Sequence, residues 1–220
     1  MKITDIKVRR YSKKFKKPIS NGKYTYEETS KVVCQINTDE KVYGIGWVEG
    51  KDIVFTAIKR LEEYLISEDP FNVEKIWSKI YLPKIFGTKG LTTRAISAVD
   101  ITLWDIIGKI VEKPLYQILG GFRDRVPAYI AGGYYEDGKS LSDLVNEMKN
   151  YTVKGARAVR MKIGRKSIEE DMERIKAVQN EIGDNIHRFL LMPITHIIKN
   201  KLLKSVNSWM KETYIGLRNP

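Results

Sequence analysis

The sequence predicts a protein of the α/β class, in two segments that differ in their secondary structure. Over residues 1–50, charged residues alternate with Ile and Val in short runs separated by turn residues, a pattern typical of strands. Residues 51–119 change to the three- and four-residue apolar spacing of amphipathic helices. From residue 123 on, strand-like and helix-like runs alternate, which predicts parallel strands joined by right-handed crossovers.

The length and composition are those of an ordinary soluble globular protein. The 220 residues are 42% hydrophobic and 30% charged, enough to bury the core of one large domain or two smaller ones. No apolar run is long enough to span a bilayer, and residues 1–11 lack the apolar core of a signal peptide. We therefore expect a cytoplasmic protein without a membrane partner.

The net charge of +12 admits four interpretations: nucleic-acid binding, a membrane surface, an anionic ligand, or lysine-rich solvent faces. The densest basic cluster, "RRYSKKFKKP" at residues 9–18, follows a strand-like run and is expected on an exposed turn. The sequence around it has no zinc-ligand spacing, RNA-binding aromatic signature or basic heptad. A solvated face is the first interpretation and attraction of acidic substrates the second, and we do not expect nucleic acid as a partner.

Three strands are expected in the first segment, at residues 1–11, 29–38 and 41–50. A turn at residues 39–40 separates the last two. The single cysteine, Cys34, cannot form an internal disulfide and is interpreted as a small buried hydrophobe. The glycines Gly44, Gly46 and Gly50 resemble a dinucleotide-binding loop only in part, because the third comes one position late and the run closes a hairpin instead of opening a helix.

Three helices are expected next, at residues 52–66, 69–81 and 92–111. In the third helix, one apolar stripe faces a core and consists of Ala95, Val99, Leu103, Ile106 and Ile110. Asp100 and Asp105 lie in the same helix, about 140° apart around its axis. That angle is too wide for adjacent metal ligands, so we interpret both as structural carboxylates. The run "LGG" at residues 119–121 ends the helical segment.

In the second segment, strands are expected at residues 125–133, 156–164 and 186–192. The two helices between them begin with capping-box pairs, Ser140 with Asp143 and Ser167 with Glu170. A (β/α) barrel and an open doubly wound sheet would both satisfy this order of elements.

Functional residues in such folds gather at the carboxyl ends of the strands. At the end of the second expected strand, Arg160 and Lys162 lie on one face and Met161 on the other. Two neighbouring cations lower the pKa of a lysine, which can then remove a proton. Solvent-exposed or ion-paired side chains are the alternative interpretation of the same residues.

Residues 94–129, "RAISAVDITLWDIIGKIVEKPLYQILGGFRDRVPAY", resemble the signature of the mandelate racemase and muconate lactonizing enzyme group of the enolase superfamily. The resemblance extends from Met1 to Met192. It implies an α+β capping domain at residues 1–122, with a three-stranded sheet and helices, followed by an incomplete enolase-type TIM barrel. Residues 123–192 would be the first three β/α units of that barrel.

The resemblance also implies the chemistry. Members abstract the proton α to a carboxylate and stabilise the enediolate on Mg²⁺, as racemases, cycloisomerases or acid-sugar dehydratases. The complete form would act on a small-molecule carboxylate or acid sugar, as a homo-oligomer. An alternative is a non-catalytic binding or assembly module built on the capping domain.

Site residues follow from the same resemblance. Lys162 matches the second lysine of the Lys-x-Lys motif, the general base, and Arg160 replaces the first lysine. The arginine keeps the charge but leaves the reaction type within the family open. The first loop of the capping domain, residues 15–26, is expected to close over the substrate with Lys17, Ile19 and Tyr24.

The resemblance fails at the metal site. The family places a metal-binding aspartate at the end of the third strand, usually in "Asp-Ala-Asn", and a glutamate at the end of the fourth. Here Met192 is followed by Pro193. The only histidines are His187 and His196, and His196 has no evident partner ligand. We therefore expect the metal ligands to be absent from this chain, Mg²⁺ to bind poorly, and turnover to be small or nil.

Codons suggest a cause. When the codons of residues 193–220 are re-read one base earlier, the boundary of Met192 and Pro193 forces alanine, and the next codon permits asparagine. The same shift makes residues 209–211 yield Asp-Glu and permits Ile-Tyr-Trp-Phe-Glu-Glu-Pro over residues 214–220. Residues 193–220 are therefore interpreted as a tail translated out of frame.

Overall fold

A computed structural model describes residues 1–81 and 90–193 of the chain. The tail after Pro193, with His196, lies outside the described residues. Two units make up the chain: Met1–Lys14 with Glu28–Arg125, and Phe15–Glu27 with the chain from Val126 on. No helix in the described ranges has the length and hydropathy needed to cross a membrane.

The strands β1 (Ile3–Ser20), β2 (Thr25–Thr38) and β3 (Tyr43–Glu49) form the sheet of the first unit, except for the end of β1 and the start of β2, which belong to the second. Strands β2 and β3 pair antiparallel, from Lys31 opposite Glu49 to Asn37 opposite Tyr43. The turn between them lies at residues 39–40, as the sequence predicts. Alternate residues of β2 are fully buried, which places one face of the sheet in a core: Val32, Cys34, Ile36.

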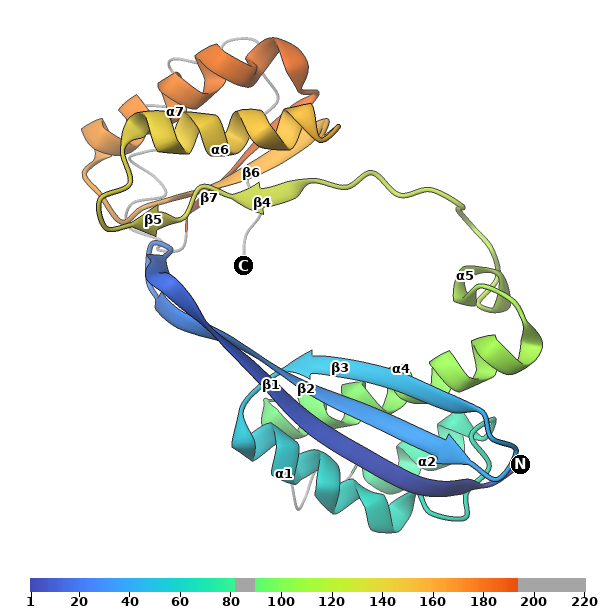
Figure 1. Cartoon of the computed structure of the whole chain (residues 1–220). Coiled ribbons are helices and arrows are strands. Elements are labelled where there is room, and N and C mark those ends of the chain that lie inside the picture. The colour runs from blue at the N-terminus through green and yellow to red at the C-terminus, as the bar shows by residue number, and fades with distance from the viewer. Residues whose placement is uncertain (82–89, 194–220) are drawn as a thin grey trace. The chain divides into compact units, whose positions relative to one another are not determined.

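Helices cover that face (Figure 1). They are α1 (Asp52–Leu61), the 3-10 turn η1 (Glu62–Tyr64), α2 (Val73–Ile80) and α4 (Leu91–Val111). The short α5 (Leu115–Ile118) follows α4. The apolar stripe predicted for residues 92–111 is confirmed, since its first four members are at most 1% exposed and Ile110 packs against them. Burial raises the pKa of the Cys34 thiol to about 11, in accord with a packing role for this cysteine.

The glycines of β3 allow α4 to lie directly on the sheet. A Cβ atom added to Gly44 would come within 2.2 Å of the carbonyl oxygen of Thr102, and one added to Gly46 within 2.3 Å of that of Ala98. The spacing of these glycines therefore reflects helix-on-sheet packing.

Side chains of α4 occupy the outer edge of β3. The backbone N–H of Ile45 donates to the carboxylate of Asp105 at 2.8 Å. Lys109 Nζ donates to the carbonyl of Tyr43 at 2.9 Å. Arg94 donates to the carbonyl of Glu49 at 3.1 Å. Asp105 is thus a structural carboxylate, as predicted.

The basic cluster at residues 9–18 is exposed, as predicted, but it lies on a strand, and the prediction of a turn is wrong. Strand β1 continues to Ser20, and its neighbour in the sheet is β2. Pairing with a second strand supplies hydrogen bonds that cannot be predicted from the local sequence. For the same reason, residues 15–26 do not form the predicted loop but the end of a hairpin with a tight turn at Asn21 to Tyr24.

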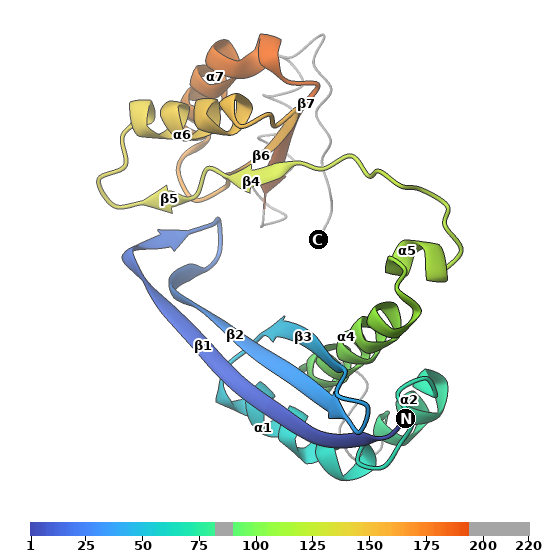
Figure 2. The same cartoon turned by 45° about the vertical axis from the view of Figure 1, so that its right-hand side comes forward.

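The second unit contains the parallel strands β4 (Ile130–Gly132), β6 (Ala158–Ile163) and β7 (Arg188–Pro193), in the order β4-β6-β7. The connecting helices α6 (Leu141–Val153) and α7 (Ile168–Ile182) lie on one side of this sheet, as Figure 2 shows, and η2 (Gly183–Asn185) follows α7. The parallel strands and both capping boxes predicted from the sequence are confirmed.

Two details of this unit were not predicted. Strand β4 has three residues, far fewer than the span 125–133, in which Pro127 lacks an N–H for a ladder. A two-residue strand, β5 (Tyr135–Glu136), pairs antiparallel with the end of β1, with Ile19 opposite Glu136 and Ser20 opposite Tyr135.

Candidate functional site

Lys162 lies next to the last residue of β6 and is only 3% exposed. Met161 packs into the core that α6 and α7 cover, and strand alternation turns Arg160 and Lys162 to the other face. Burial, and after it the positive charge of Arg160, lower the pKa of Lys162 from its ordinary 10.5 to about 8. A lysine so placed is partly neutral near pH 8 and can accept a proton.

Aromatic rings accompany both cations. Lys162 Nζ lies 5.0 Å from the centre of the Tyr134 ring, and Tyr134 in turn meets the ring of Tyr26 edge to face at 6.4 Å. Arg160 donates a hydrogen bond of 2.7 Å to the hydroxyl of Tyr129. Its Nε atom is buried and finds no acceptor within the described part of the chain. A buried guanidinium donor of this kind suits a carboxylate.

The tip of the β1–β2 hairpin lies against the end of β6. A Cβ atom added to Gly22 would lie 3.0 Å from the carbonyl oxygen of Ile163 and 3.2 Å from that of Gly164. A side chain at residue 22 would press on these two backbone carbonyls, so glycine favours this close approach of the turn to the strand end. The turn is held by Asn21, whose side chain accepts the backbone N–H groups of Lys23 and Tyr24.

The predicted capping residues differ in their contacts. Ile19 pairs with Glu136 in β5. Lys17 donates to the carbonyl of Asp137 at 3.3 Å and forms a 4.0 Å ion pair with Glu136. Tyr24 is 52% exposed, and Lys23 lies over its ring. Lys17 and Ile19 thus fasten the hairpin to β5, and Tyr24 presents an exposed ring at its tip.

Some residues of the site were not predicted. Tyr26 and Tyr134 have no sequence pattern that marks them. The dipeptide Asn21-Gly22 between two strand-like runs is a standard hairpin signal and could have revealed the turn.

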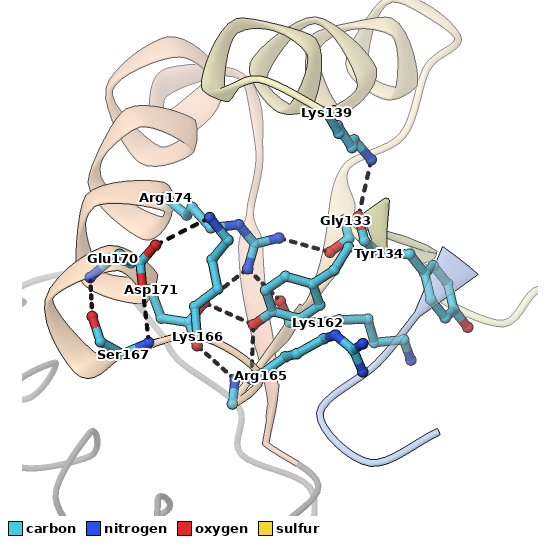
Figure 3. Close-up of polar contacts among 12 residues, drawn as sticks. Gly133, Tyr134, Lys139, Lys162, Arg165, Lys166, Ser167, Glu170, Asp171 and Arg174 are labelled. Atoms are coloured by element: carbon cyan, nitrogen blue, oxygen red, sulfur yellow. Dashed lines mark hydrogen bonds and ion pairs between the residues drawn. The ribbon is translucent and has the colours of Figure 1, made fainter. Parts of the chain in front are cut away.

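A buried polar cluster, formed by Tyr135, Asp171 and Arg174, holds the residues at the end of β6. Figure 3 shows Asp171 and Arg174 beside Lys162 and Arg165. Asp171 is fully buried and accepts hydrogen bonds from Tyr135 at 2.7 Å, from Arg174 at 2.9 Å and from the backbone N–H of Gly164 at 2.7 Å. Arg174 also donates to the backbone carbonyls of Lys162 and Gly133, at 3.2 Å and 3.0 Å.

Burial raises the pKa of the Tyr135 phenol above its ordinary value. The hydroxyl therefore stays protonated, donates to Asp171 and accepts the N–H of Arg165 at 3.2 Å. Asp171 and Arg174 stand in a strongly charged stretch of α7, and the sequence gives no sign that they point inward.

The described residues do not fit a divalent metal. They contain no group of three or more His, Cys, Asp or Glu side chains placed to hold a metal ion. On the strand beside Lys162, the register places Met192 opposite Lys162 and Pro193 opposite Ile163. Neither methionine nor proline has a side-chain oxygen, and Mg²⁺ is usually bound through carboxylates.

A family model described as "Mandelate racemase / muconate lactonizing enzyme, N-terminal domain" matches residues 3–120. Arabinonate dehydratase from Saccharolobus solfataricus is 42% identical over 160 residues, which are 70% of this chain and 43% of that protein. D-galactarolactone cycloisomerase from Agrobacterium fabrum is 32% identical over 190 residues, 84% of this chain and 50% of that protein. The chain thus spans about half the length, or less, of these curated relatives.

Solved structures agree in fold. A mandelate racemase/muconate lactonizing enzyme-like protein from Rubrobacter xylanophilus matches with a TM-score of 0.87 at 23% identity, over 98% of this chain and 60% of that one. L-talarate/galactarate dehydratase from Salmonella typhimurium LT2 matches with a TM-score of 0.83 at 20% identity, over 99% and 64%. The predicted fold class is confirmed: an amino-terminal α+β capping domain followed by a partial, barrel-like parallel sheet.

Proposed function

Since the chain belongs to the mandelate racemase / muconate lactonizing enzyme family of the enolase superfamily, we propose that Lys162 is the general base of a site that removes the proton α to the carboxylate of an acid sugar. The observation that carries this proposal is the position of Lys162, buried at the carboxyl end of β6 with a pKa lowered to about 8. The relatives named arabinonate dehydratase, L-talarate/galactarate dehydratase and D-galactarolactone cycloisomerase support the substrate class.

The amine of Lys162 takes up the α-proton in its neutral form. The resulting ammonium faces the Tyr134 ring at 5.0 Å and is stabilised there by a cation–π interaction. The charge of Arg160 opposes protonation of Lys162. These opposing influences keep the proton affinity of the amine close to the operating pH, as general-base catalysis requires.

Arg160 has a second proposed role, in binding the substrate carboxylate. Its guanidinium is anchored on the Tyr129 hydroxyl, and its buried Nε–H has no acceptor among the described residues. A carboxylate would supply that acceptor in a charge-assisted hydrogen bond. The hairpin end at residues 15–26 would cover the bound substrate, with Lys17 and Ile19 fixing it to β5 and Tyr24 contributing its exposed ring.

In the complete form of the family we propose Mg²⁺ as the group that stabilises the enediolate charge. The described residues of this chain offer no ligand set for it. We propose that the 220-residue chain therefore binds Mg²⁺ poorly and turns over little or nothing. We also propose that residues 193–220 are read out of frame, so that translation in the shifted frame beyond Met192 would restore the missing ligands.

The test is exchange of the α-proton in D₂O, followed by proton NMR with arabinonate and galactarate in the presence of Mg²⁺. We expect no exchange above buffer with the 220-residue chain. The chain translated in the shifted frame should exchange, and Lys162→Ala in that chain should slow exchange by about 10²–10⁴-fold.

Two outcomes would contradict the proposal. One is exchange by the frame-restored chain that Lys162→Ala leaves unchanged, which would remove Lys162 as the base. The other is exchange by the 220-residue chain that Lys162→Ala abolishes, which would show that this chain is active as it stands. Lys162→Arg is the matched control, because it keeps the charge but raises the pKa beyond use as a base.

A further inference from the structure

We propose that Tyr135, Asp171 and Arg174 are positioning residues for Lys162. They connect the end of β6 to β5, the strand that pairs with the capping hairpin. This inference rests on the proposed role of Lys162 as a base. The three residues lie outside the proposed base Lys162 and the proposed carboxylate-binding residue Arg160, and their role is to hold the base in place.

Arg174 fixes the backbone at Lys162 itself. Its NH1 atom donates to the carbonyl of Lys162 at 3.2 Å, and its NH2 atom donates to the carbonyl of Gly133 at 3.0 Å (Figure 3). The planar guanidinium therefore joins the ends of the neighbouring strands β6 and β4 at a set spacing. The direction of the Lys162 side chain depends on the backbone that Arg174 holds.

Asp171 and Tyr135 fix the residues that follow. The N–H of Gly164 donates to Asp171 at 2.7 Å, and the N–H of Arg165 donates to the Tyr135 hydroxyl at 3.2 Å. Together with the carbonyl of Lys162, three backbone groups within four residues are bound by side chains of α7 and β5. This strand end is thereby kept from relaxing after the sheet hydrogen bonds stop.

Tyr135 also connects this strand end to the hairpin. Its backbone pairs with Ser20 at the end of β1, and its hydroxyl reaches Asp171 and Arg165. The ring stacks under the Arg174 guanidinium at 4.0 Å. A displacement of the hairpin end is therefore transmitted to the backbone beside Lys162 through one residue.

The cost of burial also indicates a positional role. Asp171 is 0% exposed and Arg174 is 9% exposed, and a buried ion pair is often no more stabilising than apolar residues of similar volume. Unlike apolar residues, this pair forms directed hydrogen bonds to the backbone of Gly164, Lys162 and Gly133.

The experiment uses the full 220-residue chain and needs no turnover. Competitive acetylation of lysines between pH 6 and pH 11, with peptide mass spectrometry, gives the midpoint pH at which Lys162 becomes reactive. Arg160 on the same strand and the Tyr134 ring face Lys162, and both stay unchanged. In Tyr135→Phe, we expect the loosened strand end to admit water and to shift the Lys162 midpoint upward from about 8 by at least ~0.5 pH unit.

Tyr151→Phe is the matched control. It removes a phenol that donates to the carboxylate of Glu147 at 2.8 Å in the same unit, whereas the Tyr135 hydroxyl binds Asp171 and the N–H of Arg165. The control should lower the unfolding temperature by an amount similar to that of Tyr135→Phe and leave the Lys162 midpoint in place. Equal midpoints in both variants and the unsubstituted chain would overturn the proposal, as would equal shifts in the two variants.

Arg174→Lys is the second variant and covers the case in which Tyr135→Phe does not fold. Lysine keeps the charge beside Asp171 but cannot make the forked bonds to Lys162 and Gly133, so the midpoint should again rise. An unchanged midpoint in a folded Arg174→Lys chain would contradict the proposal. If Lys162 is not the base, α-proton exchange in the frame-restored chain will survive Lys162→Ala while these shifts remain, so the two failures are separable.

Discussion

The Nζ atom of Lys162 faces the ring of Tyr134 at 5.0 Å from the ring centre, and Lys162 is buried there beside the like charge of Arg160. The ring favours the charged form of the lysine, whereas burial and Arg160 disfavour it. Lys162 is therefore balanced between influences of opposite sign, of which the ring and the Arg160 charge can each be removed by a single substitution.

Replacing Tyr134 by leucine should lower the pKa of Lys162 below about 8. Leucine keeps the side chain apolar but has no π face, and a loss of about 0.5–1 kcal/mol of cation–π stabilisation corresponds to about 0.4–0.7 pH unit. The acetylation midpoint of Lys162 measures the shift. Tyr134→Phe, which keeps the ring, should leave the midpoint nearly unchanged, and a rise in Tyr134→Leu would contradict the prediction.

Lys162 should make the stability of the chain depend on pH in the alkaline range. Its pKa is about 8 in the folded chain and 10.5 in the ordinary state of a lysine. The unfolded chain therefore binds more protons between these values, and the folded chain gains stability as pH rises from about 8 to 10.5. Below pH 8 the buried Lys162 is charged, and its burial lowers the free energy of unfolding by the largest amount.

Lys162→Met removes that penalty with little change of shape. We expect the variant to exceed the unsubstituted chain in free energy of unfolding at pH 7 by up to about 3 kcal/mol, and the difference to shrink as pH approaches 10.5. Urea titrations of both chains at several pH values give the difference. A variant that is less stable at pH 7 would show that contacts of the ammonium outweigh its burial.

Gly46→Ala should unfold or severely destabilise the first unit, by about 2–4 kcal/mol or more. Its Cβ would come within 2.3 Å of the carbonyl oxygen of Ala98, which is backbone and cannot turn aside. Gly108→Ala is the control on α4, because its added Cβ meets nothing closer than 3.4 Å. Helix propensity should make the control neutral or more stable by about 0.5–1 kcal/mol, as urea denaturation would report.

The out-of-frame proposal predicts a specific nucleotide sequence. Beyond Met192, the frame shifted by one base should encode a run compatible with Ala-Asn and, later, one compatible with Trp-Phe-Glu-Glu-Pro, followed by further barrel strands. Resequencing the gene through and beyond the codon for Pro220 provides the check. An open reading frame that leads into an unrelated continuation, with stop codons in the shifted frame, would rule the proposal out.

Local signals accounted for much of the fold. The capping boxes at Ser140 and Ser167 and the apolar stripe from Ala95 to Ile110 depend on residues three or four apart, and all three predictions are confirmed. Pairing at long range was not predictable in this way. Strand β5 exists because it pairs with the end of β1, more than a hundred residues earlier in the chain.

The same division applies to the site. Strand alternation placed Arg160 and Lys162 on one face, since that relation is local. Asp171 and Arg174 were missed because, in the sequence, they look like the solvent-facing charges of a helix. Only the fold brings Gly164 and Tyr135 beside Asp171. The hydrogen bonds that they donate to it offset the free-energy cost of burying the carboxylate.

The outer edge of β3 is protected from aggregation by three side chains of α4: Asp105, Lys109 and Arg94. An open strand edge with unpaired N–H and C=O groups can recruit a strand from another molecule and start cross-β growth. Here the N–H of Ile45 and the carbonyls of Tyr43 and Glu49 are already bound by α4. A chain docking on this edge would have to displace three charged side chains first, which makes the first unit resistant to self-assembly from that side.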